Sequence, residues 1–355
     1  MSLPSTFKAA VVPEPGAQHT VVDRSLAPLA DDEVAVKITA TAVNPVDWKI
    51  RDYKVFITEY PAVLGSDAAG EVVSVGSGVK NVTVGERVFF QGIIGKYDSS
   101  TFQQYAKIPA ALVSKTPRKV SDEQAATFWV AGMAAATGLY HKTGVSFPAP
   151  WDKDGDKAGK GKAAVILGGS SSVGQYAIQL AKLSGFERIV TNASAGHASF
   201  LKTLGADVVL DRKTQNSASD FVSAVGDGLD VTFVYDSISF EATQTLAVEI
   251  LQNYNGGRVI TVTQPLPPAI EAGQKGDKKV VVQQILGIGS GPEYRYVSEP
   301  LAHHLGGEEG YIAQGKIVLN RPEVVAGGLA NIEQALQKNK EGVSGVKVVF
   351  QPHEA

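Results

Sequence analysis

The first hundred residues alternate between short β-branched runs and turn-forming residues. The runs are FKAAVVPEP, EVAVKITATAVN, GEVVSVGS and GERVFF, and Gly, Pro and Asn separate them. Short strands with frequent turn signals are typical of a compact, barrel-like β domain. The pattern therefore predicts a β-rich N-terminal domain.

Near Asp122 the pattern becomes Ala-rich and helical. We expect a helix over 121–144, with Ser121 as its N-cap and with Asp122 and Glu123 at its positive end. Residues 145–162 are rich in Gly, Lys and Asp, which predicts a surface loop. Its mixed charge is explained by solvation, and a docking loop is the alternative.

From residue 163 onward, strands and helices alternate. The strand runs VILG, RIVT, VVLD, TFVY and VITV are apolar almost throughout. Such runs are typical of strands covered by helices on both faces, which favours a parallel sheet. KKVVVQQILGIG predicts one more strand, and the tail from 330 predicts a helix and a final strand. The fold class is α/β, with a doubly wound parallel sheet behind a β-rich domain.

A glycine-rich turn follows the first of these strands, in AAVILGGSSSVGQYAIQLAKLSG. The turn consists of Gly168, Gly169, Ser170, Ser171, Ser172, Val173 and Gly174. Small residues let the backbone approach a diphosphate, and the next helix directs its N-terminal N–H groups at that diphosphate. The spacing departs from G-x-G-x-x-G, but the strand–turn–helix context favours a dinucleotide site. The alternative is a turn that serves packing alone.

The next strand ends in VTNASAGH and bears on the choice of dinucleotide. An NAD site places a carboxylate there, yet no Asp or Glu lies from Ile189 to Leu204. Ser194 can donate to a 2′-phosphate, and His197, Lys202 and Arg212 can supply positive charge. The sequence thus favours NADPH, with solvated basic residues as the alternative.

Composition narrows the function classes. The chain has 355 residues, of which 44% are hydrophobic and 19% charged, and its net charge is -3. This balance argues against nucleic acid as a partner. No apolar run is long enough to cross a membrane, and the start lacks a secretory pattern, so we expect a cytoplasmic protein. There is no cysteine, and none of the six histidines lies in an HxH or HExxH arrangement, so we expect no metal site.

AVNPVDWKIR, LGSDAAGEVVSVGSGVKNVTVGERV, GGSSSVG and GVSGVKVVF occur in the order of landmarks of the medium-chain dehydrogenase/reductase superfamily. The chain resembles that superfamily along nearly its whole length. The resemblance implies a GroES-like catalytic domain over 1–124 and 305–355, and a Rossmann NADP-binding domain over 125–304.

Within this superfamily the chain departs from the zinc alcohol dehydrogenases. It has Asn44 where they carry a cysteine ligand, and Gly65-Ser66-Asp67 where they carry Gly-His-Glu. Without a Lewis acid, an alcohol has no obvious route to losing its proton. The chain instead resembles the zinc-independent quinone and enoyl reductase branch. NPVDWK, VYDSIS and the C-terminal pattern are most similar to fungal trans-acting polyketide enoyl reductases and their toxin-cluster relatives.

The resemblance assigns roles to single residues. Asn44 is expected near the nicotinamide, where its amide positions the ring or donates to an enolate, and Lys49 contacts the substrate carbonyl or a cofactor phosphate. Thr137 matches a family threonine near the nicotinamide, and Lys347 a lysine near the cofactor. Ile288 is expected to pass near the carboxamide through backbone atoms. The alternatives are a turn role for Asn44, a solvated Lys49, and a Thr137 hydroxyl bonded to its own helix.

Further candidates for cofactor binding follow from strand ends. Asp236, Ser237 and Thr263 end parallel strands, at the edge where ligands bind in such sheets. The loops at 91–101 and 264–280 are expected to shape the substrate pocket.

The leading hypothesis is an NADPH-dependent, zinc-independent reductase of carbon–carbon double bonds conjugated to a carbonyl, with hydride delivered to the β carbon. A quinone reductase on the same scaffold and a non-catalytic NADPH-binding protein are the alternatives. Expected partners are a small-molecule enone, enoyl thioester or quinone, with an acyl-carrier or polyketide synthase partner as an extension. Both a monomer and a homodimer fit the sequence.

Overall fold

The computed structural model describes residues 3–354 and groups them into two units. The first unit contains the residues up to Val130, Gly289–Gly315 and those from Leu319 on. The second unit contains Ala131–Ile288 and Lys316–Val318. One unit is built on antiparallel strands and the other on a parallel sheet. The predicted fold class is therefore confirmed.

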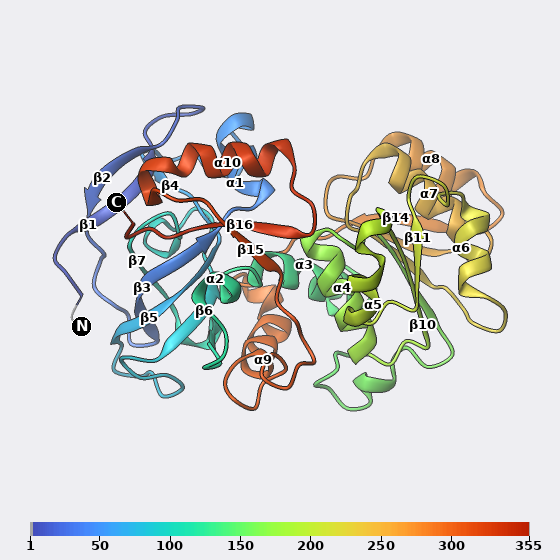
Figure 1. The fold of residues 1–355 in the computed structure, drawn as a ribbon, viewed down its shortest axis with the longest axis horizontal. Helices are drawn as coiled ribbons and strands as arrows, with labels where there is room; N and C mark the ends of the chain where they lie inside the picture. The colour runs from blue at the N-terminus through green and yellow to red at the C-terminus, as the bar shows by residue number, and fades with distance from the viewer. Residues whose placement is uncertain (1–2, 355) are drawn as a thin grey trace. The chain divides into compact units, whose positions relative to one another are not determined.

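The first unit holds two sheets (Figure 1). The smaller has the order β2-β1-β4 and comprises β1 (Phe7–Val12), β2 (Thr20–Arg24) and β4 (Ala62–Val63). The larger has the order β15-β16-β3-β5-β6-β8, and β7 also pairs with β3. Its strands are β3 (Glu33–Ala42), β5 (Asp67–Val75), β6 (Arg87–Gln91), β7 (Tyr105–Pro109), β8 (Val113–Lys115), β15 (Arg321–Val324) and β16 (Val346–Phe350). Because β16 pairs antiparallel with β3, the C-terminal segment completes the N-terminal domain.

Helices pack on these sheets and enclose apolar cores. They are α1 (Pro45–Tyr53), α2 (Asp122–Ala125), α9 (Arg295–Leu305) and α10 (Ile332–Glu341). One core gathers residues of β1, α1, α10 and β16, among them Val11, Ile50, Leu336 and Phe350. Burial of apolar side chains from distant segments supplies the main stabilising free energy of such a core.

The single helix predicted over 121–144 is wrong in one respect. Ser121 caps α2 as expected, with its side chain accepting from the Gln124 N–H. However, α2 ends at Ala125 and a second helix, α3 (Trp129–Tyr140), begins four residues later. At this break Phe128 packs edge-on against the Phe89 ring, and Trp129, the first residue of α3, packs against the same ring at a tilt. Packing of these aromatic rings overrides the helical preference of the Ala-rich segment.

The second unit is a six-stranded parallel sheet in the order β11-β10-β9-β12-β13-β14. Its strands are β9 (Ala163–Leu167), β10 (Arg188–Ala193), β11 (Val208–Asp211), β12 (Phe233–Asp236), β13 (Gly257–Thr261) and β14 (Val280–Gln284). The helices are α4 (Ser172–Leu183), α5 (Ala198–Leu204), α6 (Ala218–Val225), α7 (Glu241–Gln252) and α8 (Pro267–Lys275). Figure 1 shows α4 and α5 on one side of the sheet and α6, α7 and α8 on the other. Helices on both faces explain why the strands are apolar throughout.

The strand order of this sheet reverses between β9 and β12, which are neighbours although two strands and three α-helices lie between them in sequence. The register aligns Leu167 with Asp236, so both strands end at the same edge. A crevice outside the carboxyl ends of the strands at such a reversal is where ligands bind in open α/β sheets. The turn after Leu167 therefore lies where a ligand is expected to bind.

Two loop predictions change in the structure. Residues 145–162 are anchored rather than merely solvated, because Phe147 packs its ring against Phe186 and Phe233, and Trp151 packs against Tyr140. The segment 264–280, expected to be a loop, contains α8. Pro267 and Pro268 at the start of this helix fit its first turn, where no N–H partner is needed.

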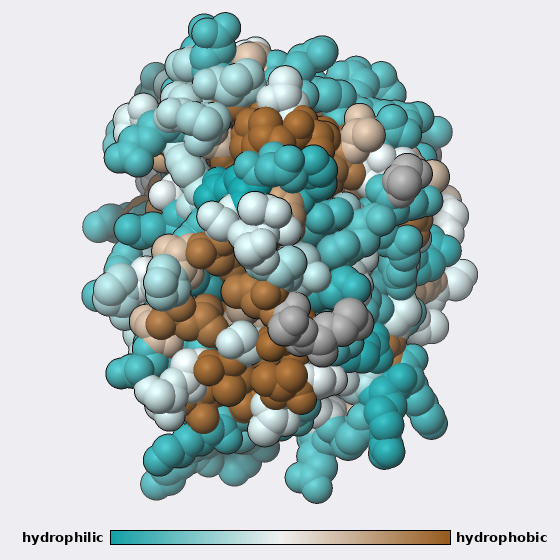
Figure 2. Space-filling model, turned by 90° about the vertical axis from the view of Figure 1, so that its left-hand side faces the viewer, coloured by the Kyte–Doolittle hydropathy of each residue, from teal (hydrophilic) through white to brown (hydrophobic). Residues whose placement is uncertain are grey.

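Some apolar surface of the first unit stays exposed. Figure 2 shows hydrophobic residues in separate groups among hydrophilic ones on one face. Well-exposed examples in this unit are Val21, Tyr53 and Phe56. Hydrophobic side chains scattered in this way are normal for folded proteins. None of the described helices is long and apolar enough to span a membrane.

Candidate functional site

The glycine turn after β9 is tightly packed. Gly168 has φ +79°, a left-handed conformation that favours glycine. A Cβ on Gly169 would lie 2.2 Å from the Thr191 hydroxyl oxygen, and one on Gly174 would lie 2.3 Å from the Gly168 carbonyl oxygen. Close packing of turn, helix and neighbouring strand therefore requires small residues at these positions.

Two serine hydroxyls tie this turn to the end of β12. Ser171 is the N-cap of α4, and its Oγ accepts from the Gly174 N–H at 2.9 Å. The same hydroxyl donates to Ser237 Oγ at 2.9 Å, and Ser237 Oγ lies 2.6 Å from the Leu167 carbonyl oxygen. Ser171 and Ser237, both predicted as cofactor ligands, thus use their hydroxyls to hold the turn on the sheet.

Three backbone N–H groups of the turn are available for an anion. Those of Ser170, Ser172 and Val173 have no hydrogen-bond partner within residues 3–354. Ser172 and Val173 are the first two residues of a twelve-residue helix, whose N-terminus carries a positive partial charge. Unpaired N–H groups at such a helix end bind phosphate. The turn therefore fits a dinucleotide diphosphate.

The end of β10 carries the residues predicted for a 2′-phosphate. Ser194 and His197 flank a 3-10 turn over Ala195–His197, and the Arg212 N–H donates to the Ala193 carbonyl at 3.0 Å. The Arg212 side chain is exposed, and it forms no ion pair in the described part of the chain. This pairing brings Arg212 beside the end of β10, although the two are far apart in sequence.

A carboxylate that was not among the predicted site residues lies at this edge. Asp211 ends β11 and is the register partner of Ala193 at the end of β10. Its Oδ1 accepts from the Lys213 N–H at 3.1 Å. Asp211 lies beyond Ile189–Leu204, the range without a carboxylate, and the parallel sheet places the end of β11 next to the end of β10.

The remaining cofactor candidates of the second unit have different surroundings. Asp236 accepts from the N–H groups of Ile238 and Ser239 and from the Thr243 hydroxyl, and burial raises its pKa. Thr263 donates to the Ser239 carbonyl at 3.0 Å. Both residues therefore shape the turn between β12 and α7.

Thr137 and Ile288 are placed differently from these turn residues. Thr137 lies in α3, and its buried hydroxyl has no hydrogen-bond partner among the described residues. This does not match the alternative of a hydroxyl bonded to its own helix. Ile288 is half-buried and follows β14 by four residues.

The first unit contains a buried polar cluster around Asn44. Asn44 is the N-cap of α1, with Pro45 as the first helical residue, and its backbone N–H donates to Asp47 Oδ2 at 2.7 Å. Its side-chain Nδ2 donates to Asp67 Oδ2 at 2.9 Å, and its Oδ1 accepts from Lys347 Nζ. Asp67 begins β5 and Lys347 lies in β16, so three distant segments meet here.

The carboxylates of this cluster are strongly desolvated. Burial raises the pKa of Asp47 to about 7, against the opposing hydrogen bond from the Asn44 N–H. Burial also raises the pKa of Asp67, while the Lys347 ammonium, the Asn44 amide and the Val130 N–H act in the opposite direction. The Lys347 Nζ lies 3.4 Å from Asp67 Oδ2. Two carboxyl groups and one lysine ammonium therefore surround the Asn44 amide.

Lys49 lies on the same helix as Asn44 but outside this cluster. Its Nζ lies 5.6 Å from the centre of the Trp48 ring, and it has no carboxylate partner in the described residues. The structure thus brings Asn44 and Lys347 together and leaves Lys49 apart from them. The assignments of all predicted site residues to substrate or cofactor stay predictions.

Two family models match the chain. The alcohol dehydrogenase GroES-like domain matches residues 30–118, and the zinc-binding dehydrogenase model matches residues 172–298. Trans-enoyl reductase himH of Aspergillus japonicus is 31% identical over 332 residues, which cover 90% of this chain and 89% of that protein. Trans-enoyl reductase tndF of Aspergillus flavipes is 33% identical over 357 residues, covering 96% and 98%.

The chain belongs to the medium-chain dehydrogenase/reductase superfamily. Members of this superfamily use NAD(P)H. Quinone oxidoreductases are also among the proteins that this member resembles. The structure of a putative zinc-dependent alcohol dehydrogenase from Rhizobium etli CFN 42 has the same fold, with a TM-score of 0.78, 22% identity and 98% of each chain covered.

A zinc ion does not fit the residues around Asn44 in this superfamily member. The cluster offers an amide, two carboxylates and the Lys347 ammonium, whose charge opposes a second cation. No group of three or more His, Cys, Asp or Glu within residues 3–354 could hold a metal ion. We therefore derive no step through zinc.

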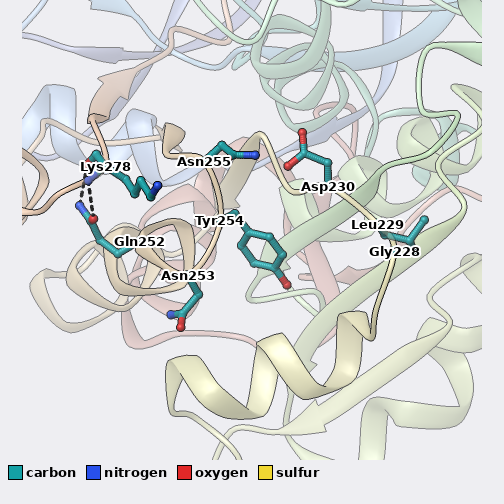
Figure 3. A pocket seen from close by; sticks show the side chains of 8 residues that line it. All are labelled: Gly228, Leu229, Asp230, Gln252, Asn253, Tyr254, Asn255 and Lys278. Atoms are coloured by element: carbon teal, nitrogen blue, oxygen red, sulfur yellow. Dashed lines mark hydrogen bonds between the residues drawn. The ribbon is translucent and has the colours of Figure 1, made fainter.

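A hollow of about 690 Å³ in the second unit lies at the wrong edge of the sheet for the dinucleotide (Figure 3). Its lining residues Asp230, Asn255 and Lys278 precede β12, β13 and β14. Figure 3 shows Gln252 bonded to the backbone of Lys278, and Tyr254 turned away from Lys278. Ligands of parallel sheets bind at the opposite, carboxyl edge.

Proposed function

We propose that this superfamily member is an NADPH-dependent, zinc-independent reductase of carbon–carbon double bonds conjugated to a carbonyl. The observation that carries the proposal is the buried Asn44 amide. The Asn44 Oδ1 accepts from Lys347, one Nδ2–H donates to Asp67, and the second Nδ2–H has no acceptor among the described residues. An oriented, unsatisfied donor of this kind suits an oxygen on which negative charge develops.

The second unit supplies the residues for NADPH. The N–H groups of Ser170, Ser172 and Val173 would bind the diphosphate, and Ser194, His197 and Arg212 the 2′-phosphate. The unpartnered Thr137 hydroxyl is a further candidate donor or acceptor for the nicotinamide end. When bound, NADPH supplies a hydride to the β carbon of the substrate.

The first unit supplies the groups for the substrate. As the β carbon is reduced, negative charge moves through the conjugated system to the carbonyl oxygen. The remaining Asn44 Nδ2–H donates to this oxygen in our proposal, and the α carbon then takes a proton from a side chain or from water. Because Lys347 and Asp67 hold the amide before the reaction begins, no reorganisation is needed.

The substrate class follows from the relatives. Two proteins that match the chain over nearly its full length are called trans-enoyl reductases. We therefore propose an enoyl thioester or a related enone as substrate, with a polyketide enoyl chain and its carrier protein as one source.

Side-by-side turnover tests this proposal. NADPH oxidation is followed by absorbance with a crotonyl thioester, a simple enone and a quinone, with NADH as the cofactor control. We expect turnover of the thioester or enone, and a loss of about a hundredfold in kcat for Asn44→Ala. Lys107→Met is the matched control and should keep the wild-type rate. Lys107 lies on β7 of the same unit and pairs with Glu33.

A quinone reductase is the second candidate, since quinone oxidoreductases are among the proteins that the chain resembles. Turnover of the quinone alone would replace the leading proposal with this one. Binding of NADPH without turnover of any acceptor would leave a non-catalytic binding protein and remove the role of Asn44.

A further inference from the structure

Lys347 was expected near the cofactor, yet its surroundings lie in the first unit. Its side chain is 4% exposed, and its Nζ contacts Asn44 Oδ1 and Asp67 Oδ2. An ammonium so deeply buried is costly unless it is paired. Here the Lys347 ammonium is paired with Asp67 and hydrogen-bonded to Asn44.

The chemistry of these groups fixes the orientation of the Asn44 amide. An asparagine amide can lie in two orientations that exchange its oxygen and its nitrogen. Lys347 can only donate and an ionised Asp67 can only accept, so the oxygen faces Lys347 and the nitrogen faces Asp67. This arrangement also determines the direction of the second Nδ2–H.

We infer that Lys347 is a positioning residue of the active site, which with Asp67 fixes the Asn44 amide so that its remaining Nδ2–H points to one place. In this proposal Lys347 acts through Asn44, with which it shares a hydrogen bond. The inference rests on the proposed function, in which this N–H stabilises the developing charge. The cofactor contact that the family resemblance implies for Lys347 stays a separate prediction.

A double-mutant cycle tests whether Lys347 acts through Asn44. Lys347→Met should lower kcat by about tenfold or more in the wild-type background and by less than about twofold in the Asn44→Ala background. The dissociation constant of NADPH should stay within about twofold of the wild-type value. Equal losses of kcat in both backgrounds, or a matching rise in the NADPH constant, would overturn the inference.

Lys347→Met leaves Asp67 buried without its cation, and the variant could fail to fold for that reason. Asp67→Asn/Lys347→Met removes both charges and keeps the volume. This pair should fold and still lose kcat, because the Val130 N–H then holds the new amide oxygen at position 67 and the new amide nitrogen faces Asn44, which favours the reversed orientation of the Asn44 amide. Lys107→Met is again the control, with its ion pair to Glu33 at 3.0 Å. Wild-type kcat in the folded charge-free pair would contradict positioning.

A second measurement is independent of turnover. The Nδ2 signals of Asn44 in an amide NMR spectrum are identified by their absence in Asn44→Ala. They should shift in Lys347→Met and stay in place in Lys107→Met, because only Lys347 polarises the amide oxygen. If the wild-type chain reduces none of the acceptors, the proposed function fails, and this spectrum still decides whether Lys347 orients Asn44. Unmoved signals overturn the inference.

Discussion

The Ser171 hydroxyl donates a 2.9 Å hydrogen bond to the Ser237 hydroxyl and so joins the glycine turn after β9 to the end of β12. These strands are neighbours at the reversal of strand order, and one serine follows each of them. The hydroxyl pair thereby holds the first turn of α4 in place while its unpaired N–H groups remain available for an anion.

Ser171→Ala should weaken both the fold and NADPH binding. The substitution removes the N-cap of α4 and its bond to Ser237, which costs about 0.5–2 kcal/mol of stability. We expect the dissociation constant of NADPH to rise about fivefold or more, because the turn loses its anchor. Urea unfolding and NADPH titration by Trp fluorescence measure the two effects.

Ser217→Ala is the matched control for this prediction. Ser217 caps α6 in the same unit, where its side chain accepts from the Asp220 N–H. It should lose similar stability and bind NADPH as the wild type does. Equal weakening of NADPH binding in both variants would mean that stability, rather than the turn, controls the affinity.

Gly174→Ala tests whether the glycine turn is required by packing. The added Cβ would lie 2.3 Å from the Gly168 carbonyl oxygen and 2.9 Å from the Gly169 Cα, both backbone atoms that cannot move independently. We expect a loss of about 1–3 kcal/mol in stability without cofactor, measured by urea unfolding. Gly196→Ala, where a Cβ meets nothing within 4 Å, should leave stability unchanged.

The parallel sheet was predictable from the sequence because each strand carries its own signal. Runs such as those of β9 and β12 are fully buried on both faces, and burial needs apolar residues at every position. The turn at Gly168–Gly174 was predictable for a similar local reason. The break between α2 and α3 was missed because it depends on the Phe89 ring, which comes from a distant strand.

The candidate site was predicted one residue at a time. Asn44 and Lys347 were both named, yet only the pairing of β16 with β3 brings their segments together. Asp47 was not named as a candidate, and the burial of its carboxylate follows from tertiary packing. Asp211 was missed because register between strands is invisible in a single sequence.

Cofactor preference should depend on the neighbours Arg212 and Asp211. Arg212→Ala should raise the dissociation constant of NADPH by about tenfold and leave that of NADH unchanged, because a guanidinium pairs with a 2′-phosphate. Asp211→Asn should favour NADPH further by removing a negative charge next to the end of β10. Lys213→Ala is the control on the same loop. A parallel loss of NADH binding in Arg212→Ala would argue against a 2′-phosphate contact.

Asp47 should make stability depend on pH in an unusual direction. Its pKa is raised to about 7 in the folded protein from 3.8 in the unfolded chain. A raised pKa gives stability that is fully present below about pH 3.8 and is lost as pH rises from there through about 7. Asp47→Asn should therefore gain stability relative to the wild type between about pH 4 and pH 7, by at most about 1.4 kcal/mol per pH unit, and the difference should stay constant above that range. If the difference in urea midpoint between Asp47→Asn and the wild type does not change with pH, Asp47 does not titrate in this range.

Glu333 should make stability depend on pH in the direction opposite to that of Asp47, with stability lost at acid pH. It accepts from the His19 N–H and ring Nδ1, each at 2.8 Å, and from Arg51. Against the burial that raises it, these partners hold the pKa of Glu333 at about 2, below its value of 4.5 in the unfolded chain. The contribution is then complete above pH 4.5 and is lost as pH falls toward 2.

Glu333→Gln should therefore be less stable than the wild type near neutral pH, by on the order of 2–3 kcal/mol. The difference should shrink as pH falls below about 4.5, because the wild-type carboxylate becomes protonated there. Glu323→Gln, on β15 and paired with Lys338 on the exposed side of α10, is the control and should change stability by less than about 1 kcal/mol. Urea midpoints across the acid range measure both variants. If the urea midpoint of Glu333→Gln stays below that of the wild type at the lowest pH, Glu333 stabilises the fold through packing rather than through its charge.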